Sequence, residues 1–467
     1  MIVSGNKGIG NDKAIGDPKK LPIATQLAHI IVNQSRPLSP TAHLIRGGAT
    51  TQLFLPNGSQ LYTISDEIAH RVNVLMNQHD EVGLQKELVK IGLDAPTYID
   101  NTPLESPRLY ALSLAIAQKC NMGCTYCYAS QGDFGGPSKN MSLETAFKSI
   151  DLLLKDCPEG GKAQLTFLGG EPLVNRKAIK EAVLYAETKA LQKNIRIMYS
   201  ITTNGTLLTE YDADFFETYG FAVTISLDGL GAEHDLNRPM KGGKGSFDTI
   251  MKNIKPLLAI QKKMQVAARV TVTPENTNLA TTLDEFVKMG FHSVGFSPLL
   301  RSSNGQNEMT EDSLLLMLEN MIACGLNFEK NVLAGIRYPF LNMVNALKEI
   351  SKGTHRPYPC GAGAGYMGVS ADEELFACHR FVNEDVGLMG DLTNGVNADL
   401  QNNWLASRHV HTQEPCSQCW ARYLCGGGCH HEVIEKGRPA CDYIRSWLFY
   451  TIQAHERLSR FKPNSFN

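Results

Sequence analysis

The sequence lacks three features that would indicate a particular partner or location. It has no excess of charge, because 45 basic residues are balanced by 47 acidic ones, so it offers no strong field to attract nucleic acid or a membrane surface. It has no apolar run near the ~20 residues that a membrane span requires. Its first stretch, MIVSGNKGIGNDKAIGD, has no apolar core like that of a secretory signal. We therefore expect a cytoplasmic protein that binds neither nucleic acid nor membrane.

Cysteine, in contrast, is abundant, with twelve residues in the chain. Reducing conditions in the cytoplasm keep thiols unpaired, so ligation of metals or clusters explains these cysteines better than disulfides do. Cys157 and Cys324 stand alone and are interpreted as small buried apolar residues. The other ten fall into groups along the chain: Cys120, Cys124 and Cys127; Cys360 and Cys378; and Cys416, Cys419, Cys425, Cys429 and Cys441.

The length of 467 residues favours two or three domains. Residues 1–40 are rich in Gly, Lys, Asn and Pro and are predicted to be poorly ordered. Residues 41–107 contain three short strand patterns, HLIRG, TTQLFL and SQLYTI, followed by a helical pattern with Ser65 or Asp66 as its cap. They are expected to form a small separate module.

Six apolar runs alternate with helical stretches between residues 108 and 305. This alternation predicts an α/β fold with a parallel sheet covered by helices, in which the carboxyl ends of the strands face one active site. The first four runs are followed by Cys120 and by the segments GGEP, TTNG and SLDG. Residues 306–355 are expected to form a helical bridge. Residues 356–467, which end in a predicted helix, are so rich in Gly and Cys that bound metal would supply much of their folding energy.

The first cysteine group has the spacing C-x3-C-x2-C and directly follows a predicted strand. A loop folded over a four-iron cubane can bring each of three thiolates to a different iron. The fourth iron then stays open, and an open coordination position is typical of a catalytic site rather than a structural one. A zinc site with a distant fourth ligand is the alternative.

This stretch resembles the signature of the radical S-adenosylmethionine (SAM) enzymes. The resemblance implies a partial (β/α)6 TIM-like barrel, a [4Fe-4S] cluster on the three cysteines, and SAM chelating the open iron. It also implies that Tyr126 lies by the adenine and that Glu171 of GGEP lies near the methionine amino group. The full set of implied SAM contacts is Tyr126, Gly169, Gly170, Glu171, Asn204, Ser226 and Arg269. Reductive cleavage of SAM would give a 5′-deoxyadenosyl radical that takes hydrogen from an unactivated carbon.

The C-terminal cysteines resemble the SPASM domain, an extension of radical SAM enzymes that act on peptides. The resemblance implies two auxiliary [4Fe-4S] clusters, and so three in all. The outer cluster would use Cys416, Cys419, Cys425 and Cys441, and the inner one Cys360, Cys378 and Cys429. The inner cluster would lack a fourth cysteine, so His355, His379 or a substrate thiolate is a candidate ligand. A double zinc ribbon is the alternative for this region.

Two positions depart from the wider family. Glu373 stands five residues before Cys378, where SPASM domains often have Gly. His379 follows Cys378, where the sulfatase-maturing members have an aspartate proposed as the general base. This difference weakens the formylglycine interpretation and makes His379 the candidate base.

The segments YASQGDFGG, GKGSFD and CHRF resemble most those of thioether-forming enzymes, such as the maturases of six-cysteine peptides and of quinohemoprotein amine dehydrogenase. The resemblance implies cross-links from cysteine sulfur to aspartate or glutamate methylene carbons, in the small subunit of that dehydrogenase. Other SPASM chemistry, as in sulfatase maturases or carbon–carbon cross-linkers, and a non-enzymatic iron–sulfur electron carrier are the alternatives.

The same resemblance implies two kinds of partner. The substrate would be a peptide or small protein, and its leader segment would add a strand to a winged-helix-like module at residues 41–107. Alternatively, that module only stabilises the barrel. A flavodoxin or ferredoxin would supply electrons.

Overall fold

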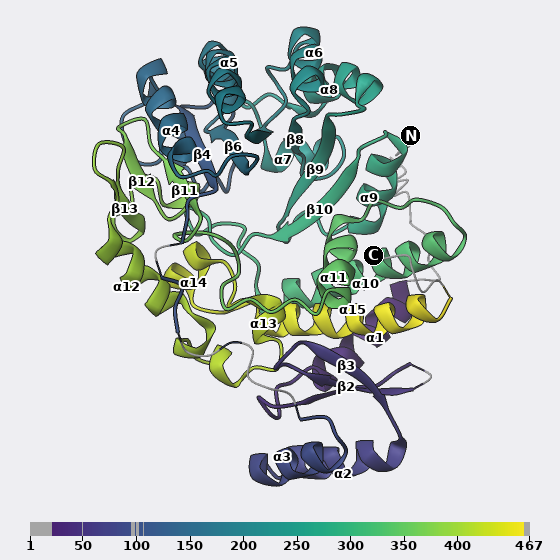
Figure 1. The fold of residues 1–467 in the computed structure, drawn as a ribbon. Helices are drawn as coiled ribbons and strands as arrows, with labels where there is room; N and C mark the ends of the chain where they lie inside the picture. The colour runs from purple at the N-terminus through teal and green to yellow at the C-terminus, as the bar shows by residue number, and fades with distance from the viewer. Residues whose placement is uncertain (1–20, 49, 95–98, 100–101, 106, 462–467) are drawn as a thin grey trace, which may run out of the picture.

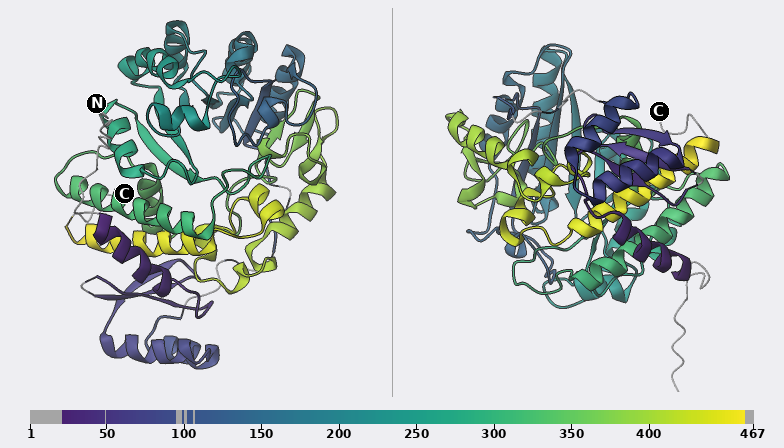
Figure 2. Two further views of the ribbon diagram at one scale, coloured as in Figure 1. Left: turned by 180° about the vertical axis from the view of Figure 1, so that it is seen from behind. Right: turned by 90° about the horizontal axis from the view of Figure 1, so that it is seen from below.

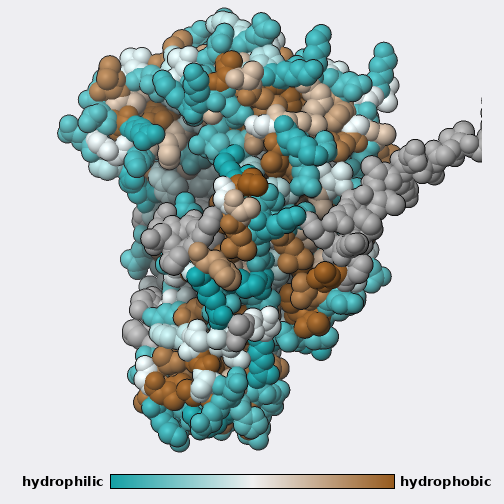
Figure 3. Space-filling model, turned by 90° about the vertical axis from the view of Figure 1, so that its right-hand side faces the viewer, coloured by the Kyte–Doolittle hydropathy of each residue, from teal (hydrophilic) through white to brown (hydrophobic). Residues whose placement is uncertain are grey.

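The computed structural model describes residues 21–48, 50–94, 99, 102–105 and 107–461 (Figure 1). An N-terminal module follows the first helix, and a curved sheet with its helices forms most of the molecule. In Figure 3 the module lies at the lower end of the molecule, where teal and brown side chains are mixed on its surface.

The N-terminal module is a three-stranded antiparallel sheet with two helices. The strand order is β1-β2-β3, and Ser65 begins α2 by accepting a hydrogen bond from the backbone N–H of Ile68. Leu53, Val72 and Leu84 are fully buried in a core that the module forms by itself. The three strands, the helix and the Ser65 cap are therefore confirmed. The elements are β1 (His43–Ile45), β2 (Thr51–Leu55), β3 (Gln60–Ile64), α2 (Asp66–Asn77) and α3 (Glu81–Lys90).

The prediction that residues 1–40 are poorly ordered is wrong for part of this segment. Residues Leu21–Gln34 form helix α1, and residues 1–20 lie outside the described residues. Ala24, Ala28 and Ile31 recur at helical spacing and are buried. They form one face that packs against α10 (Glu311–Leu333) and α15 (Cys441–Phe461). Figure 2 shows α1 beside the long C-terminal helix.

Six parallel strands form the centre of the molecule, in the order β10-β9-β8-β7-β6-β4. These are the six apolar runs predicted from the sequence. Helices α4, α5, α6 and α8 cover one side of the sheet (Figure 1). The strands are β4 (Ala111–Gln118), β6 (Lys162–Gly169), β7 (Arg196–Thr203), β8 (Ala222–Ser226), β9 (Gln265–Val272) and β10 (Ser293–Pro298). The helices between them are α4 (Leu143–Lys155), α5 (Arg176–Gln192), α6 (Glu210–Tyr219), α7 (Ala232–Asn237), α8 (Phe247–Ile260) and α9 (Leu279–Lys288).

The two faces of this sheet differ in polarity. On β7, Tyr199 and Ile201 are buried, and the Tyr199 hydroxyl donates to Glu187 of α5 at 2.6 Å. Their neighbours Ser200 and Thr202 point the opposite way and are more exposed. Parallel sheets are normally apolar on both faces because helices cover both. The polar inner face of this sheet is therefore available to line a site.

The C-terminal region continues the same sheet. Strand β11 (Tyr366–Val369) pairs in parallel with β4, on the side opposite β6. The antiparallel strands β12 (Glu374–Phe376), β13 (Leu388–Asp391) and β14 (Gly395–Val396) follow, and the short β5 (Lys139–Asn140) also pairs with β4. The remaining helices are α11 (Leu341–Ser351), α12 (Ala398–Arg408), α13 (Arg422–Cys425) and α14 (His430–Lys436). Among the described residues, no helix is both long and apolar enough to cross a membrane.

Candidate active site and metal centres

The first cysteine group lies in the loop after β4 and lines a cavity of about 280 Å³ at the carboxyl ends of the strands. Burial is the main cause that raises the pKa of the Cys124 thiol to about 12; Arg238 lowers this pKa, and the neighbouring Cys127 and Cys120 raise it. The three thiols therefore share one site, and the Cys124 thiol is neutral unless a bound cation ionises it. A bound metal group would supply that charge, because a coordinating thiol is deprotonated.

Glycines allow the end of β6 to touch this cysteine loop. A Cβ atom on Gly170 would lie 2.5 Å from the backbone oxygen of Lys119, and one on Gly169 would lie 2.2 Å from the backbone oxygen of Ala117. Both distances are too short for any side chain. Gly169 and Gly170 line the cavity, and their close packing also fixes the position of the loop that carries Cys120.

Glu171 lies behind the cavity wall rather than among the side chains that line it. It is fully buried, and its carboxylate accepts hydrogen bonds from the Thr203 hydroxyl at 2.7 Å and from the backbone N–H groups of Asn204 at 2.8 Å and Leu173 at 3.0 Å. Burial raises the pKa of Glu171, and these hydrogen bonds oppose that rise. Glu171 therefore joins the end of β6 to the end of β7.

Asn204 continues this connection to the cysteine loop. Its side-chain amide donates to Asn121 at 3.0 Å and lies 3.8 Å from the sulfur of Cys120. Asn204 and Ser226, which ends β8, both line the cavity. Arg269 is on β9, where it donates to the Ser297 hydroxyl of β10. It lies two residues before Thr271, which does line the cavity.

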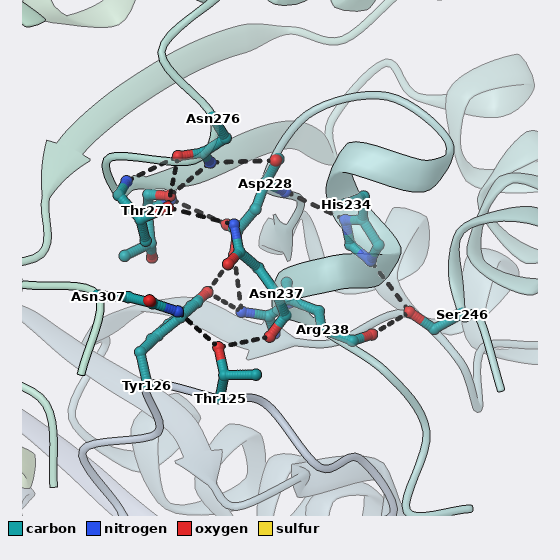
Figure 4. A network of polar contacts seen from close by, with 11 residues as sticks. Thr125, Tyr126, Asp228, His234, Asn237, Arg238, Ser246, Thr271, Asn276 and Asn307 are labelled. Atoms are coloured by element: carbon teal, nitrogen blue, oxygen red, sulfur yellow. Dashed lines mark hydrogen bonds and ion pairs between the residues drawn. The ribbon is translucent and has the colours of Figure 1, made fainter. Parts of the chain in front are cut away.

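Tyr126 is held by a buried polar network (Figure 4). Its hydroxyl donates to the carboxylate of Asp228 and accepts a hydrogen bond from Arg238 at 2.6 Å. Asp228 also accepts from the backbone N–H of Thr271 at 2.9 Å. These contacts fix the cysteine loop against β8 and β9.

Sequence reasoning missed Asp228 and Arg238 as site residues. Asp228 stands inside SLDG, whose position after a strand was the available indication, whereas nothing in the local sequence singles out Arg238. Burial alone would lower the pKa of Arg238, but the neighbouring Cys124, Tyr126 and Asp228 raise it above its usual range. The Arg238 guanidinium lines the cavity, so it places a fixed positive charge beside the cysteines.

His379 lines the same cavity, although it follows Cys378 of another cysteine group. Its Nδ1 atom lies 2.7 Å from the Tyr366 hydroxyl, which lies 2.8 Å from the hydroxyl of Ser113 on β4. Burial, with a contribution from Arg380, lowers the pKa of His379 to about 4, so the ring is neutral at pH 7. The other candidate histidine, His355, is close to the backbone oxygen of Gly353 at 2.7 Å.

The C-terminal cysteines lie near one another. Burial is the main cause that raises the pKa of Cys378 to about 12, and the neighbouring Cys429 and Cys360 contribute to the rise. Burial raises the pKa of Cys416 to about 12 as well, with contributions from the other outer cysteines, Cys425, Cys441 and Cys419. The four outer cysteines line one cavity, and Cys429, which the resemblance assigns to the inner group, lines it as well. In each group the thiols are close enough to repel one another when ionised, as ligands of one cluster would be.

Within the described part of the chain, no three Cys, His, Asp or Glu side chains converge closely enough to hold a single metal ion. In a [4Fe-4S] cluster, each thiolate binds a different iron.

Comparison with known proteins gives a family match for the central part of the chain. Residues 114–286 match the Radical SAM superfamily. An uncharacterized protein of Methanocaldococcus jannaschii is 34% identical over 192 residues, which are 40% of this chain and 62% of that protein. The chain therefore spans less than two thirds of that relative. The cysteine-type anaerobic sulfatase-maturating enzyme of Clostridium novyi is 28% identical over 337 residues, 67% of this chain and 85% of that enzyme.

Solved structures share the fold. Native anSMEcpe with bound AdoMet and Cp18Cys peptide has a TM-score of 0.62 and 21% identity, and the match covers 77% of this chain and all of that one. Streptococcus suis SuiB bound to the precursor peptide SuiA has a TM-score of 0.52 and 15% identity, with 84% and 94% covered. Residues 114–286 are therefore similar to the radical SAM superfamily, whose members use a [4Fe-4S] cluster and SAM, and most of the chain is similar in sequence to an anaerobic sulfatase-maturating enzyme.

Proposed function

We propose that the chain is a radical SAM enzyme that modifies a peptide or small protein by joining a substrate cysteine sulfur to a carbon, such as the methylene of an aspartate or glutamate. One observation carries this proposal: a single cavity is lined both by Cys120, Cys124 and Cys127 and by His379, which follows a cysteine of the inner group. A substrate in this cavity would lie between a radical-forming site and an auxiliary site. Relatives named for sulfatase maturation, and a structure with a bound precursor peptide, support a peptide substrate.

Cys120, Cys124 and Cys127 would hold a cluster that, with SAM, would supply the radical for hydrogen abstraction from the substrate carbon, and Cys360, Cys378 and Cys429 would hold a cluster that could take up the surplus electron. His379 would take the thiol proton as the sulfur bonds to that carbon. In the tautomer whose Nδ1–H donates to Tyr366, Nε2 is the acceptor for this proton. A pKa of about 4 leaves His379 unprotonated at pH 7, and it also makes the ring a weak base. The net change is a two-electron oxidation of the substrate.

The cofactor set in this proposal is three [4Fe-4S] clusters and SAM. The proposed substrate is the small subunit of quinohemoprotein amine dehydrogenase, and the proposed reductant is a flavodoxin or ferredoxin. The leader of the substrate would bind the N-terminal module as an added strand. Strand β3 suits this role because it ends the three-stranded sheet, whereas the other edge strand, β1, contacts α15. Main-chain hydrogen bonds to an edge strand hold an extended peptide with little demand on its sequence.

Formylglycine formation is the second candidate, because the Clostridium novyi relative is a sulfatase-maturating enzyme. The presence of His379 after Cys378, where an aspartate would be expected, favours the thioether reaction. Mass spectrometry of a cysteine-containing peptide encoded beside this gene, before and after reaction, distinguishes them. A thioether removes two hydrogens and blocks alkylation of the cysteine, whereas formylglycine formation from cysteine removes the sulfur. A modified product whose cysteine is still alkylated would contradict the thioether proposal.

A further inference from the structure

Arg380 lies between the first cysteine group and the inner one. Its Nη1 atom lies 3.6 Å from the sulfur of Cys429, and its backbone N–H donates to the sulfur of Cys378 at 3.4 Å. The guanidinium carbon lies 5.2 Å from the ring centre of Tyr128, the residue directly after Cys127. One cationic side chain thus contacts an inner cysteine and the ring that adjoins the radical site.

The charge of Arg380 is only partly neutralised by the residues around it. Glu432 accepts a hydrogen bond from Nη1 at 2.8 Å, and the Arg380 side chain is 20% exposed. The Nε atom is buried without a hydrogen-bond partner in the described part of the chain. Burial alone would lower the pKa of Arg380, but Cys429 and Glu432 raise it. A charged arginine therefore remains at this position at any ordinary pH.

We propose that Arg380 is a positioning residue that sets the electron affinity of the inner auxiliary centre, with Glu432 opposing it. The proposal rests on the proposed function, because it assumes a cluster on Cys360, Cys378 and Cys429. Hydrogen bonds and positive charge at the sulfur ligands stabilise the reduced form of a cluster, which carries one more negative charge. Arg380 supplies hydrogen bonds and a positive charge to the inner cysteines, and the negative charge of Glu432 offsets part of that positive charge. The inner centre is thereby tuned to accept an electron from the substrate.

The packing of Arg380 on Tyr128 adds a geometric role. Tyr128 lines the cavity, and burial is the main reason that its pKa is raised, with both Cys127 and Cys378 among its charged neighbours. The aromatic ring and the guanidinium therefore stand in contact between the two cysteine groups. A substrate radical formed in the cavity would lie next to the side chain that makes the inner centre a better acceptor.

Potentiometric titration of the reconstituted full chain, followed by electron paramagnetic resonance, tests this inference. Arg380→Gln should make reduction of one centre about tenfold less favourable, which corresponds to about 59 mV for a one-electron couple. Arg380→Lys, which keeps the charge, should shift it less. Glu432→Gln should shift the same centre in the opposite direction. An unchanged potential in Arg380→Gln, or shifts of the same sign in Arg380→Gln and Glu432→Gln, would overturn the inference. If Arg380→Gln does not fold, the sign of the potential shift in Glu432→Gln decides. Easier reduction of the centre would support the inference, and harder reduction would overturn it.

Arg301→Gln is the matched control. Its side chain is 21% exposed, pairs with Glu384 at 3.5 Å and Glu435 at 3.6 Å, and also contacts His431, so it is a paired arginine of similar exposure that makes no hydrogen bond to a cysteine sulfur among the described residues. It should leave every potential unchanged, and an equal shift in this variant would count against a specific role of Arg380. Iron content separates this inference from the proposed function. If Cys378→Ala with Cys429→Ala holds as much iron as wild type, the inner cluster itself is absent. A loss of about four irons with unchanged potentials in Arg380→Gln contradicts only the role of Arg380.

Discussion

Cys120, Cys124 and Cys127 lie in a loop supported by the ends of parallel strands, whereas Cys416, Cys419 and Cys425 lie in or beside short helical turns and Cys441 begins the long helix α15. The first loop is fixed by close glycine packing and by the buried hydrogen bonds of Glu171 and Asp228. The apolar cluster around Cys416 is small, and among the described residues its other buried members are Val410 and Tyr423, although the nearby Trp420 and Leu424 belong to the main core. The first site is therefore held by the sheet, and we expect the second to depend more on what it binds.

The largest expected effect concerns the preorganised site. Cys124→Ala should abolish 5′-deoxyadenosine formation from SAM with dithionite after anaerobic reconstitution, because a missing ligand removes the cluster. The fold should persist, since the loop rests on the sheet, and circular dichroism should match wild type. Cys157→Ala, at a buried cysteine outside the three groups, is the control and should keep full activity. Equal 5′-deoxyadenosine from wild type and Cys124→Ala would remove the radical mechanism.

The outer site should behave in the opposite way. Cys419→Ala should unfold residues 416–441 locally, because structural metal binding contributes on the order of 10 kcal/mol to such regions. Limited proteolysis should then cut this segment in Cys419→Ala while Cys157→Ala stays resistant. A protease-resistant Cys419→Ala variant would mean that the outer region folds without its metal group, and the contrast between the two sites would disappear.

The role of glycine packing at the first site gives a smaller expected effect. Gly170→Ala places a methyl group 2.5 Å from the backbone oxygen of Lys119, and overpacking against backbone costs up to about 3 kcal/mol. Thermal unfolding should therefore occur at a lower temperature, and less iron should be retained at this site. Gly242→Ala is the control because a Cβ atom there meets nothing within 4 Å. Equal stability of the two variants would show that the loop is not held by this contact.

Local patterns predicted the strands and the cysteine groups because both are short-range properties of the chain. Apolar runs between helical stretches identified all six parallel strands, whereas the division of the C-terminal cysteines into an outer and an inner group came from the family resemblance. The buried network could not be predicted, because Tyr126 meets Arg238 across 112 positions in the sequence. Helix α1 was not predicted, because its apolar face is buried only when it packs against α10 and α15, which are distant in the sequence. The contacts of Glu171 could not be predicted either, because its carboxylate bonds to Thr203 and Asn204, whose positions depend on the sheet.

The smallest expected effect concerns the contact between the outer region and the N-terminal module. His43 of β1 stacks on Trp420 with ring centres 4.4 Å apart, and burial lowers the pKa of His43 to about 3. The unfolded chain binds a proton at this residue near pH 6.5 and the folded chain does not, so stability is lost as the pH falls below 6.5 toward 3. Between pH 7 and pH 5 the loss should be about 2 kcal/mol.

His43→Phe keeps an aromatic ring on Trp420 but cannot be protonated, so denaturant unfolding at pH 7 and pH 5 should differ less for this variant than for wild type. Both proteins share all other titrating groups. The difference between their two losses of stability from pH 7 to pH 5 therefore isolates the contribution of His43. An equal loss of stability in both proteins would contradict a contribution from His43. If wild type loses more stability than His43→Phe, the contact between His43 and Trp420 helps to hold the outer region. The fold of that region would then depend only partly on its metal group. The first site differs, because the glycine packing and the buried hydrogen bonds of Glu171 and Asp228 that hold its loop come from the sheet and its connecting loops.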